Sequence, residues 1–246
     1  MSTLENGREI TFGEAVKEAL IEEMHRDSHV FIIGEDVAEA GTVFKVLTGL
    51  LDEFGPDRVI DSPISEAGIT GIGVGAAVTG MRPVVDIMFG DFTTLAMDQM
   101  VNQAAKTHYM SGGKLRVPMV IRTTMGAGRR SAAQHSQSLH AWYSHIPGLK
   151  VAIPSTPYDA KGLMKTAIRE DNPVVIVEDK MMYSLKGIVP NEEYTIPLGV
   201  ADVKRVGEDI TLVATSQMVH LALEASQKLA ELDISAEVVD PRTTFP

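Results

Sequence analysis

Residues 58–88 read RVIDSPISEAGITGIGVGAAVTGMRPVVDIM, and this stretch contains the pattern that indicates the fold. An apolar strand at 58–61 is followed by a helix rich in glycine and alanine at 66–79, and then by a second strand at 83–88. Two strands joined through a helix form a βαβ unit with parallel strands. Because the strands are β-branched and apolar without strict alternation, we expect helices to cover both faces of their sheet.

The same alternation of strands and helices extends in both directions from this stretch. Near the N-terminus, Thr11 and Glu14 have the spacing of a capping box before an apolar helical stripe. Further strands are predicted at 30–33, 117–122, 150–153 and 174–177, and further helices at 93–109 and 157–170. These elements predict one doubly wound α/β domain over residues 1–184, which is an ordinary domain size.

The pattern changes in residues 185–199, which contain glycine, two prolines and acidic residues without a helical period. We expect a linker there. Residues 200–246 then show a strand at 210–214, a helix at 219–232 and a strand at 236–239. One βαβ unit of this size is too small to cover both faces of its own sheet. We therefore expect residues 200–246 to be the incomplete beginning of a second α/β domain.

Composition excludes several classes of function. The chain has 246 residues, a formal net charge of −11 and no cysteine. The negative charge argues against a nucleic-acid-binding surface, because phosphates would be repelled. The missing cysteines exclude disulfides and thiolate metal sites. Neither a signal-peptide core nor an apolar run long enough to span a bilayer is present. We therefore expect a cytoplasmic protein without a membrane or nucleic-acid partner.

Glu66 is the first candidate for a functional residue. It follows the strand at 58–61, and active sites in parallel α/β sheets gather at the carboxyl ends of strands. A structural role explains the position equally well, because Ser65 would cap the helix and an acidic side chain is favourable in the first turn. Position alone leaves both interpretations open.

Three glycines in the helix at 66–79 lie on roughly one helical face: Gly68, Gly71 and Gly75. Each glycine costs a helix about 1 kcal/mol relative to alanine, so a close backbone contact is expected in return. The glycines continue through the helix and do not form only its entry turn, which is unlike a dinucleotide-binding fingerprint. We expect this face to pack closely against another helix, and a helix of a neighbouring subunit fits this expectation.

A glycine- and arginine-rich loop precedes His135, in the segment GAGRRSAAQHSQ at 126–137. Such a loop is typical of a mobile active-site segment, although an isolated histidine is more often structural. His140 and His145 follow at five-residue steps, which do not place three histidines on one helical face for zinc.

Taken together, several segments resemble the β subunits of the thiamin-diphosphate-dependent 2-oxo acid dehydrogenases over nearly the whole chain. They are GEDV at 34–37, IDSPISE at 60–66, DQMVNQAAK at 98–106, YMSGG at 109–113, QHSQ at 134–137, PGLKV at 147–151 and DAKGL at 159–163. The resemblance implies a pyrimidine-binding domain followed by the start of a transketolase C-terminal-like domain.

The resemblance also implies roles for individual residues. Glu66 would hydrogen-bond N1′ of the aminopyrimidine, Phe92 would stack on this ring, and Met88 would line its pocket. His135 would be the active-site histidine that acts near the substrate and the lipoyl group. A potassium site would be formed, mainly through carbonyl oxygens, by Met119, Ala167, Ile168, Glu170 and Asn172. The family often has aspartate at the position of Glu170. Arg129 and Arg130 match no feature of the family.

The family's magnesium–diphosphate motif, Gly-Asp-Gly with a downstream asparagine, is absent from the chain. An α subunit would supply it, in a heterotetramer of two α and two β subunits that acts with a lipoyl acyltransferase core. The implied reaction is the oxidative decarboxylation of pyruvate or a branched-chain 2-oxo acid, with reductive acylation of the lipoyl group. An acetoin dehydrogenase β subunit and a truncated, non-catalytic binding homologue remain alternatives. The family implies the cytoplasm, or the mitochondrial matrix after removal of a transit peptide.

Overall fold

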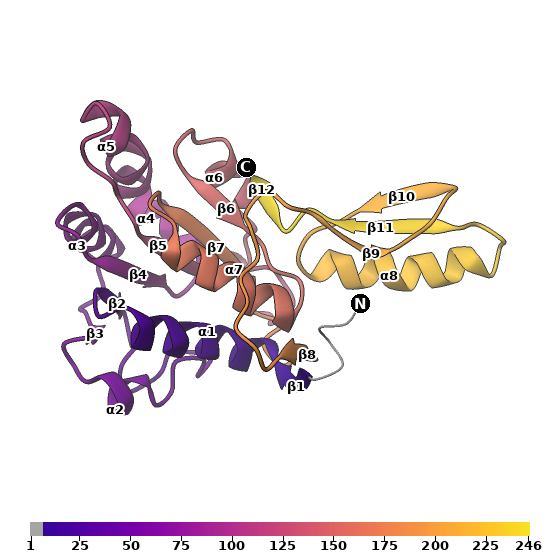
Figure 1. Ribbon diagram of the computed structural model, residues 1–246, viewed down its shortest axis with the longest axis horizontal. Coiled ribbons are helices and arrows are strands. Elements are labelled where there is room, and N and C mark those ends of the chain that lie inside the picture. Colours follow the sequence, from indigo (N-terminus) through magenta and orange to yellow (C-terminus); the bar gives the residue numbers. More distant parts are fainter. Residues whose placement is uncertain (1–6) are drawn as a thin grey trace.

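The computed structural model describes residues 7–246, and its main body is built around a seven-stranded sheet of order β12-β6-β7-β5-β4-β2-β3 (Figure 1). All neighbours run parallel except β12, which pairs antiparallel with β6 at one edge. The strands are β2 (Val30–Gly34), β3 (Val59–Asp61), β4 (Arg82–Ile87), β5 (Val120–Met125), β6 (Lys150–Ala152), β7 (Val174–Asp179) and β12 (Thr243–Phe245).

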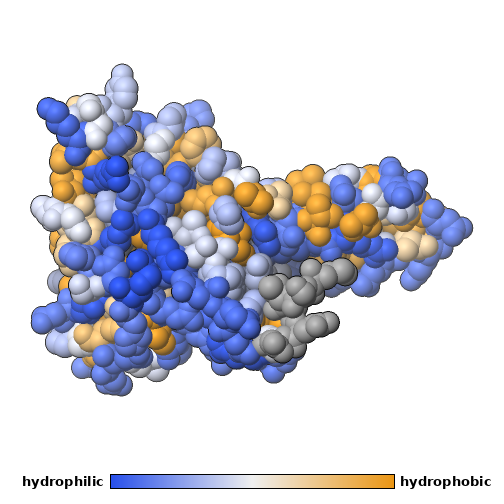
Figure 2. Space-filling view, in the orientation of Figure 1, coloured by the Kyte–Doolittle hydropathy of each residue, from blue (hydrophilic) through white to orange (hydrophobic). Residues whose placement is uncertain are grey.

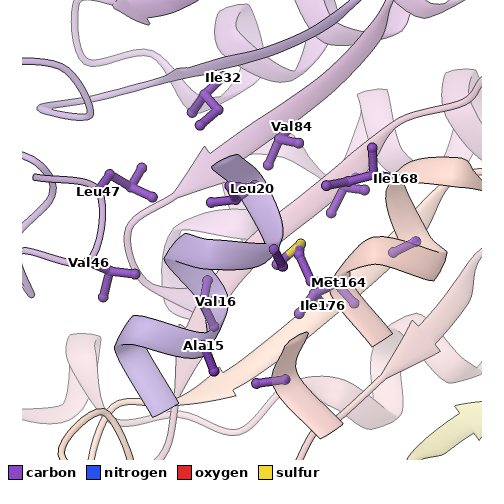
Figure 3. Close-up of a cluster of buried hydrophobic side chains, with 14 of the residues drawn as sticks. Ala15, Val16, Leu20, Ile32, Val46, Leu47, Val84, Met164, Ile168 and Ile176 are labelled. Atoms are coloured by element: carbon purple, nitrogen blue, oxygen red, sulfur yellow. The ribbon is translucent and has the colours of Figure 1, made fainter. Parts of the chain in front are cut away.

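Helices cover both faces of this sheet, which confirms the doubly wound α/β architecture. On one face α1 (Phe12–Arg26) packs against α7 (Pro157–Arg169), and both bury apolar side chains against the central strands (Figure 3). The other face is covered by α3 (Glu66–Val78), α4 (Thr93–Asp98), a π-helical turn η2 (Gln99–Ala104), α5 (Ala105–Met110) and α6 (His140–Ser144).

The first helix begins where the sequence predicts it. Thr11 Oγ1 accepts a hydrogen bond from the backbone N–H of Glu14 at 3.2 Å, and the Thr11 N–H donates to Glu14 Oε2 at 2.7 Å. Along the contact between α1 and α7, the ammonium groups of Lys161 and Lys165 each lie 2.6 Å from Glu22. Their stems are almost fully buried, so the helix pair is joined by both apolar packing and charge.

Three local predictions differ from the structure. The strand predicted at 117–122 begins only at Val120, and the helix predicted at 93–109 is interrupted by the π-helical turn η2. The segment predicted to be a linker contains β8 (Lys186–Pro190), which pairs antiparallel with β1 (Gly7–Thr11). Neither β1 nor β8 has a clear apolar pattern, because both belong to a two-stranded sheet whose residues are mostly half-buried or exposed.

The C-terminal residues form a small unit that extends sideways from the main body (Figure 1). Its sheet has the order β10-β11-β9, with one helix packed on it: β9 (Asp202–Arg205), β10 (Ile210–Val213), β11 (Ala236–Asp240) and α8 (Gln217–Ala230). Hydrophobic side chains remain on its surface (Figure 2), among them Val203 and Val213, which are 50% and 67% exposed. The unit is joined to α7 through Asp159, which accepts a 2.7 Å hydrogen bond from Arg242.

Three shorter elements complete the described part of the chain: α2 (Leu50–Phe54) packs near β3, and the 3₁₀ turns η1 (Gly90–Phe92) and η3 (Ala133–His135) follow β4 and β5. Within residues 7–246, every helix is too short or too polar to cross a membrane.

Candidate active site

Three residues singled out from the sequence, Glu66, Met88 and His135, lie along the carboxyl edge of the seven-stranded sheet. Glu66 follows β3, Met88 follows β4, and the loop that carries His135 follows β5. Because these strands are parallel and close together in the order β5-β4-β2-β3, their carboxyl ends open on one edge of the sheet. The topology therefore places these segments where parallel α/β sheets bind ligands.

Glu66 is the first residue of α3, and its side chain is only 8% exposed. Ser65 caps the helix by accepting a 3.3 Å hydrogen bond from the N–H of Gly68. Within residues 7–246, no group donates a hydrogen bond to the Glu66 carboxylate. Burial, together with the neighbouring carboxylates of Asp36 and Glu66, raises the pKa of Glu35 at the end of β2. Glu66 is thus a buried acceptor in acidic surroundings.

Phe92 and His135 are separated by more than forty positions in the sequence, and the structure brings them together. The ring of His135 lies edge-on to Phe89 and Phe92, with centroids 4.7 and 5.3 Å apart. Phe89 and Phe92 also contact each other, at 5.8 Å. Such edge-to-face contacts fix the relative orientation of aromatic rings. The three rings form one cluster at the end of β4, which we call the aromatic cluster.

The loop between β5 and α6 is closed at its base by a 3.3 Å hydrogen bond from the N–H of Gly126 to the carbonyl of Gln137. Arg130 and Ala132 adopt positive φ angles of 56° and 63° within it, which side-chain-bearing residues rarely do. Arg129 places its guanidinium 4.9 Å from the ring centre of Phe44, so this arginine tethers the loop to the body. Arg130 is exposed.

Met88 lies at the same edge, immediately after β4, and is half-buried. Its carbonyl oxygen accepts a 2.7 Å hydrogen bond from Thr124 Oγ1 on the neighbouring strand. This hydrogen bond links Met88, the first residue after β4, to β5, next to the aromatic cluster.

Two buried charged residues near His135 were not predicted from the sequence. Lys180, at the end of β7, is 1% exposed and donates a hydrogen bond to the carbonyl oxygen of His135. Asp91, in the turn η1 that follows β4, is 5% exposed and accepts hydrogen bonds from Gln137. Burial lowers the pKa of Lys180, and Asp91 acts in the opposite direction. The only signal in the sequence is that both residues lie soon after apolar strands.

A further buried ion cluster joins the central strands, again without a sequence prediction. Arg122 on β5 forms two 2.7 Å hydrogen bonds with Glu178 on β7 and an ion pair with Asp86 on β4. The hydroxyl of Tyr183 donates to Glu178 at 2.7 Å. All four side chains are buried, so one guanidinium links three neighbouring strands just before they reach the candidate site.

The residues of the implied potassium site lie close together, but several of their oxygens are engaged. Arg82 donates hydrogen bonds to the carbonyl oxygens of Ile168 and Glu170, at 3.0 and 3.1 Å. Met119 accepts from the N–H of Val174 at 3.0 Å. A guanidinium therefore already places positive charge against two of the proposed ligands. The potassium site fits poorly with this arrangement and stays a prediction.

The glycines of α3 differ in what surrounds them. A side chain at Gly75 would meet nothing within 4 Å, and one at Gly71 would meet only Gln99, at 3.7 Å. Gly73, which the sequence analysis did not place on this face, is the glycine that packs inside the chain, because a Cβ there would lie 2.4 Å from Val85. Within the described chain, Gly71 and Gly75 are therefore not required for internal packing.

Comparison with known proteins agrees with this architecture. The transketolase pyrimidine-binding domain family matches residues 8–186, and the transketolase C-terminal domain family matches residues 199–246. Among solved structures, a split-gene transketolase described as an inactive β4 tetramer superposes with a TM-score of 0.77 at 23% identity, covering 94% of this chain and 71% of that one. This likeness shows the fold.

Sequence relatives are much closer. The β subunit of acetoin:2,6-dichlorophenolindophenol oxidoreductase from Bacillus subtilis is 51% identical over 97% of this chain and 73% of its own length. The β subunit of B. subtilis 2-oxoisovalerate dehydrogenase is 47% identical, covering 96% of this chain and 73% of its own length. The pyruvate dehydrogenase E1 β subunit of Rickettsia conorii is 51% identical, covering 97% and 73%. The chain therefore belongs to the transketolase-like family of 2-oxo acid and acetoin dehydrogenase β subunits.

Proposed function

We propose that this chain is a catalytic β subunit of a thiamin-diphosphate-dependent 2-oxo acid dehydrogenase, with an active site completed by an α subunit. The observation that carries the proposal is the Glu66 side chain, which is only 8% exposed at the carboxyl edge of the sheet and accepts no hydrogen bond from a described residue. Its carboxylate oxygens are not among the fully buried atoms, so the carboxylate is open to a ligand that supplies the donor.

The surroundings of Glu66 fit an aminopyrimidine. A carboxyl group can share a proton with a ring nitrogen, which is the role we propose for Glu66 toward N1′. β3 and β4 are separated only by β2, so the strands that lead to Glu66 and to Phe92 lie roughly 10 Å apart. We propose that the aminopyrimidine binds between Glu66 and Phe92, beyond the ends of these strands. In this arrangement Phe92 stacks on the ring and Met88 lines the pocket.

His135 is suited to a role near the substrate and the lipoyl group. Neither of its ring nitrogens forms a hydrogen bond with another residue of the described chain, while its ring is held by Phe89 and Phe92. An imidazole with free nitrogens in a fixed position can exchange protons with a bound reactant. We propose that His135 does so during transfer of the acyl group to the lipoyl group. When bound, thiamin diphosphate supplies the carbanion-stabilising chemistry of the decarboxylation.

The partner proposals follow from what the chain contains and lacks. We propose that the α subunit supplies the magnesium ion and its diphosphate ligands, since the motif for them is absent from this sequence. The names of the relatives support an α subunit as a partner, because they are β subunits of larger enzymes. A heterotetramer of two α and two β subunits that docks on a lipoyl acyltransferase core, in the cytoplasm, completes the proposal. No step of it depends on potassium.

There are two alternatives, and one of them has specific support. The 51% identity to the acetoin oxidoreductase β subunit equals that to the R. conorii pyruvate dehydrogenase β subunit, so acetoin remains a candidate substrate. A non-catalytic homologue that only binds a partner is the second alternative. The joint presence of Glu66, Phe92 and His135 at one edge of the sheet favours the catalytic function, because a binding protein has no need of all three.

Co-expression of the chain with its α subunit, followed by turnover measurements with an artificial electron acceptor, tests the proposal. Pyruvate, branched-chain 2-oxo acids and acetoin are the substrates to compare. We expect turnover of one of them that requires both subunits and thiamin diphosphate. An assembled complex that turns over none of these substrates would support the non-catalytic alternative.

Thiamin diphosphate is expected to bind weakly to the chain in the absence of the α subunit. The chain offers the aminopyrimidine pocket but no magnesium–diphosphate motif, and the charged diphosphate provides much of the anchoring. Isothermal titration calorimetry with and without magnesium measures this directly. Tight, magnesium-dependent binding to the isolated chain would contradict the shared site.

Gly71→Leu is expected to prevent assembly with the α subunit while leaving the chain folded. Gly71 has only Gln99 nearby, so a leucine is tolerated within the chain, but a contact built for backbone approach cannot accept it. Overpacking of this kind costs about 1–3 kcal/mol. Size-exclusion chromatography with light scattering measures assembly. A fully assembled Gly71→Leu complex would show that this glycine has no interface role.

A further inference from the structure

Two buried charged side chains anchor the short turn that carries His135. The Lys180 ammonium donates to the carbonyl oxygen of His135. Asp91 Oδ1 accepts from the backbone N–H of Gln137 at 3.2 Å and from its side-chain amide at 2.8 Å. The anchors act on either side of Ser136: Lys180 directly follows β7, and Asp91 lies in the turn η1 after β4. Neither residue has a part in the chemistry proposed above.

Burial of the charged groups of Lys180 and Asp91 destabilises the folded chain, which indicates that these two residues have a function where they are. A buried charge is unfavourable unless it is paired and hydrogen-bonded. Lys180 is 1% exposed and Asp91 is 5% exposed, and one oxygen of Asp91, Oδ2, is buried without any hydrogen-bond partner in the described chain. Asp91 therefore keeps one acceptor oxygen without a donor, which is unusual for a residue with a purely structural role. The hydrogen bonds that both residues do form are charge-assisted, and these are roughly twice as strong as neutral ones.

The imidazole of His135 depends on these anchors for its position. Its ring nitrogens form no hydrogen bond with another described residue, so the ring is held only by the backbone of the turn and by the edges of Phe89 and Phe92. The Lys180 ammonium also lies 5.4 Å from the ring centre of Phe89. The same cation thus holds the backbone of His135 and one of the rings that His135 contacts.

We propose that Lys180 and Asp91 are positioning residues that fix the turn from His135 to Gln137 and thereby hold the His135 imidazole against Phe92. This inference rests on the proposed function, in which His135 takes part in acyl transfer. Neither residue touches the reactants; each acts through the backbone of the loop. A misplacement of about 1 Å in a catalytic group is enough to cost about 10²-fold in rate.

The first test uses the enzyme assembled with its α subunit and compares Lys180→Met with Lys180→Arg. Methionine has a similar length but cannot donate, so we expect kcat for lipoyl acylation to fall about 10²-fold with little change in KM for the 2-oxo acid. Arginine keeps a charged donor, and we expect it to recover most of the lost kcat. Arg130→Met, which removes an exposed cation from the same loop, is the control and is expected to leave kcat unchanged.

The second test does not depend on activity. Arg129 and Arg130 lie in the anchored loop, so the rate of tryptic cleavage after them, followed by intact-mass spectrometry on the full chain, reports how often the loop opens. Gln137→Glu places a carboxylate against that of Asp91, and we expect cleavage to become roughly tenfold faster. Gln134→Glu introduces the same charge at an exposed position three residues earlier in the loop, and we expect wild-type cleavage.

The two tests separate this inference from the proposed function. If the wild-type complex turns over no substrate, the proposed function fails, while the comparison of Gln137→Glu with Gln134→Glu still tests the anchors. Cleavage of both glutamate variants at the same rate overturns the inference. In an active complex, Lys180→Arg that is no better than Lys180→Met overturns it as well. If Lys180→Met does not fold, the cleavage rate of Gln137→Glu, a substitution at an exposed position, still tests whether the turn is anchored.

Discussion

Glu66→Gln is expected to lower the turnover of the assembled enzyme by about 10²–10⁴-fold, which is the usual loss when proton-transfer catalysis is removed. Glutamine has nearly the same shape as glutamate, and its amide still accepts a hydrogen bond from a donor. It cannot share a proton with N1′ as a carboxyl group does. The substitution therefore lowers the rate of the reaction and leaves the fold intact.

The same substitution is expected to leave the thermal midpoint of unfolding unchanged or slightly higher. The Glu66 side chain is only 8% exposed, and its carboxylate accepts no hydrogen bond from the described chain. Replacing it by a neutral amide therefore breaks no contact within the chain and lowers the cost of enclosing a charge. Turnover with an artificial electron acceptor and a melting curve by circular dichroism measure the two effects. Glu53→Gln, on exposed helix α2, is the matched control and should change neither.

A Glu66→Gln enzyme with near wild-type turnover would remove Glu66 from the catalytic role. A variant that loses turnover and also unfolds at a much lower temperature would point to the capping interpretation, in which the acidic side chain serves the start of α3. The two interpretations that position alone left open are thus separated by one variant and two measurements.

Arg122→Met is expected to destabilise the folded chain by about 3–5 kcal/mol, which is the usual cost of breaking a buried ion pair by removing one partner. The substitution leaves the carboxylates of Asp86 and Glu178 buried beside each other without their cation. For a chain of this length the loss corresponds to a fall in the melting temperature of roughly 6–20 °C. Urea denaturation followed by circular dichroism measures the free energy of unfolding.

Arg116→Met is the matched control for this prediction. Arg116 also pairs with a carboxylate, that of Asp171, but its side chain is 65% exposed. Exposed ion pairs contribute about 0–1 kcal/mol, so the control is expected to have little effect. Equal effects of the two substitutions would mean that the three-strand cluster around Arg122 does not contribute to stability as its burial indicates.

The main elements of the fold were predicted well from local pattern. The strand at 58–61, the helix at 66–79 and the strand at 83–88 correspond to β3, α3 and β4 within one or two residues. The capping box at Thr11 and Glu14 is present as predicted. These features depend on residues near one another in sequence, where period and capping chemistry are sufficient. The family resemblance, which rests on short ordered segments, is confirmed as well.

The elements that were not predicted have a weak apolar pattern or pair with a strand that is far away in the sequence. The strand β12 joins the edge of the main sheet although it follows the C-terminal unit in sequence, and no local pattern announces that return. The pairing of β1 with β8 joins the start of the predicted first domain to the segment predicted to be a linker. Short strands of this kind carry too few apolar residues to be recognised, because their stability comes from the partner strand.

For the candidate site, the sequence by itself determined which residues stand at the ends of apolar strands, and thus that Glu66, Met88 and the His135 loop open on one edge of the sheet. Only the tertiary structure decided that His135 meets Phe92, that Lys180 and Asp91 hold its turn, and that Arg122 joins three strands beneath it. The physical reason is the same in each case. Periodicity describes how a segment faces the core, whereas contacts between distant charges and rings depend on the order of strands in the sheet, which local sequence does not encode.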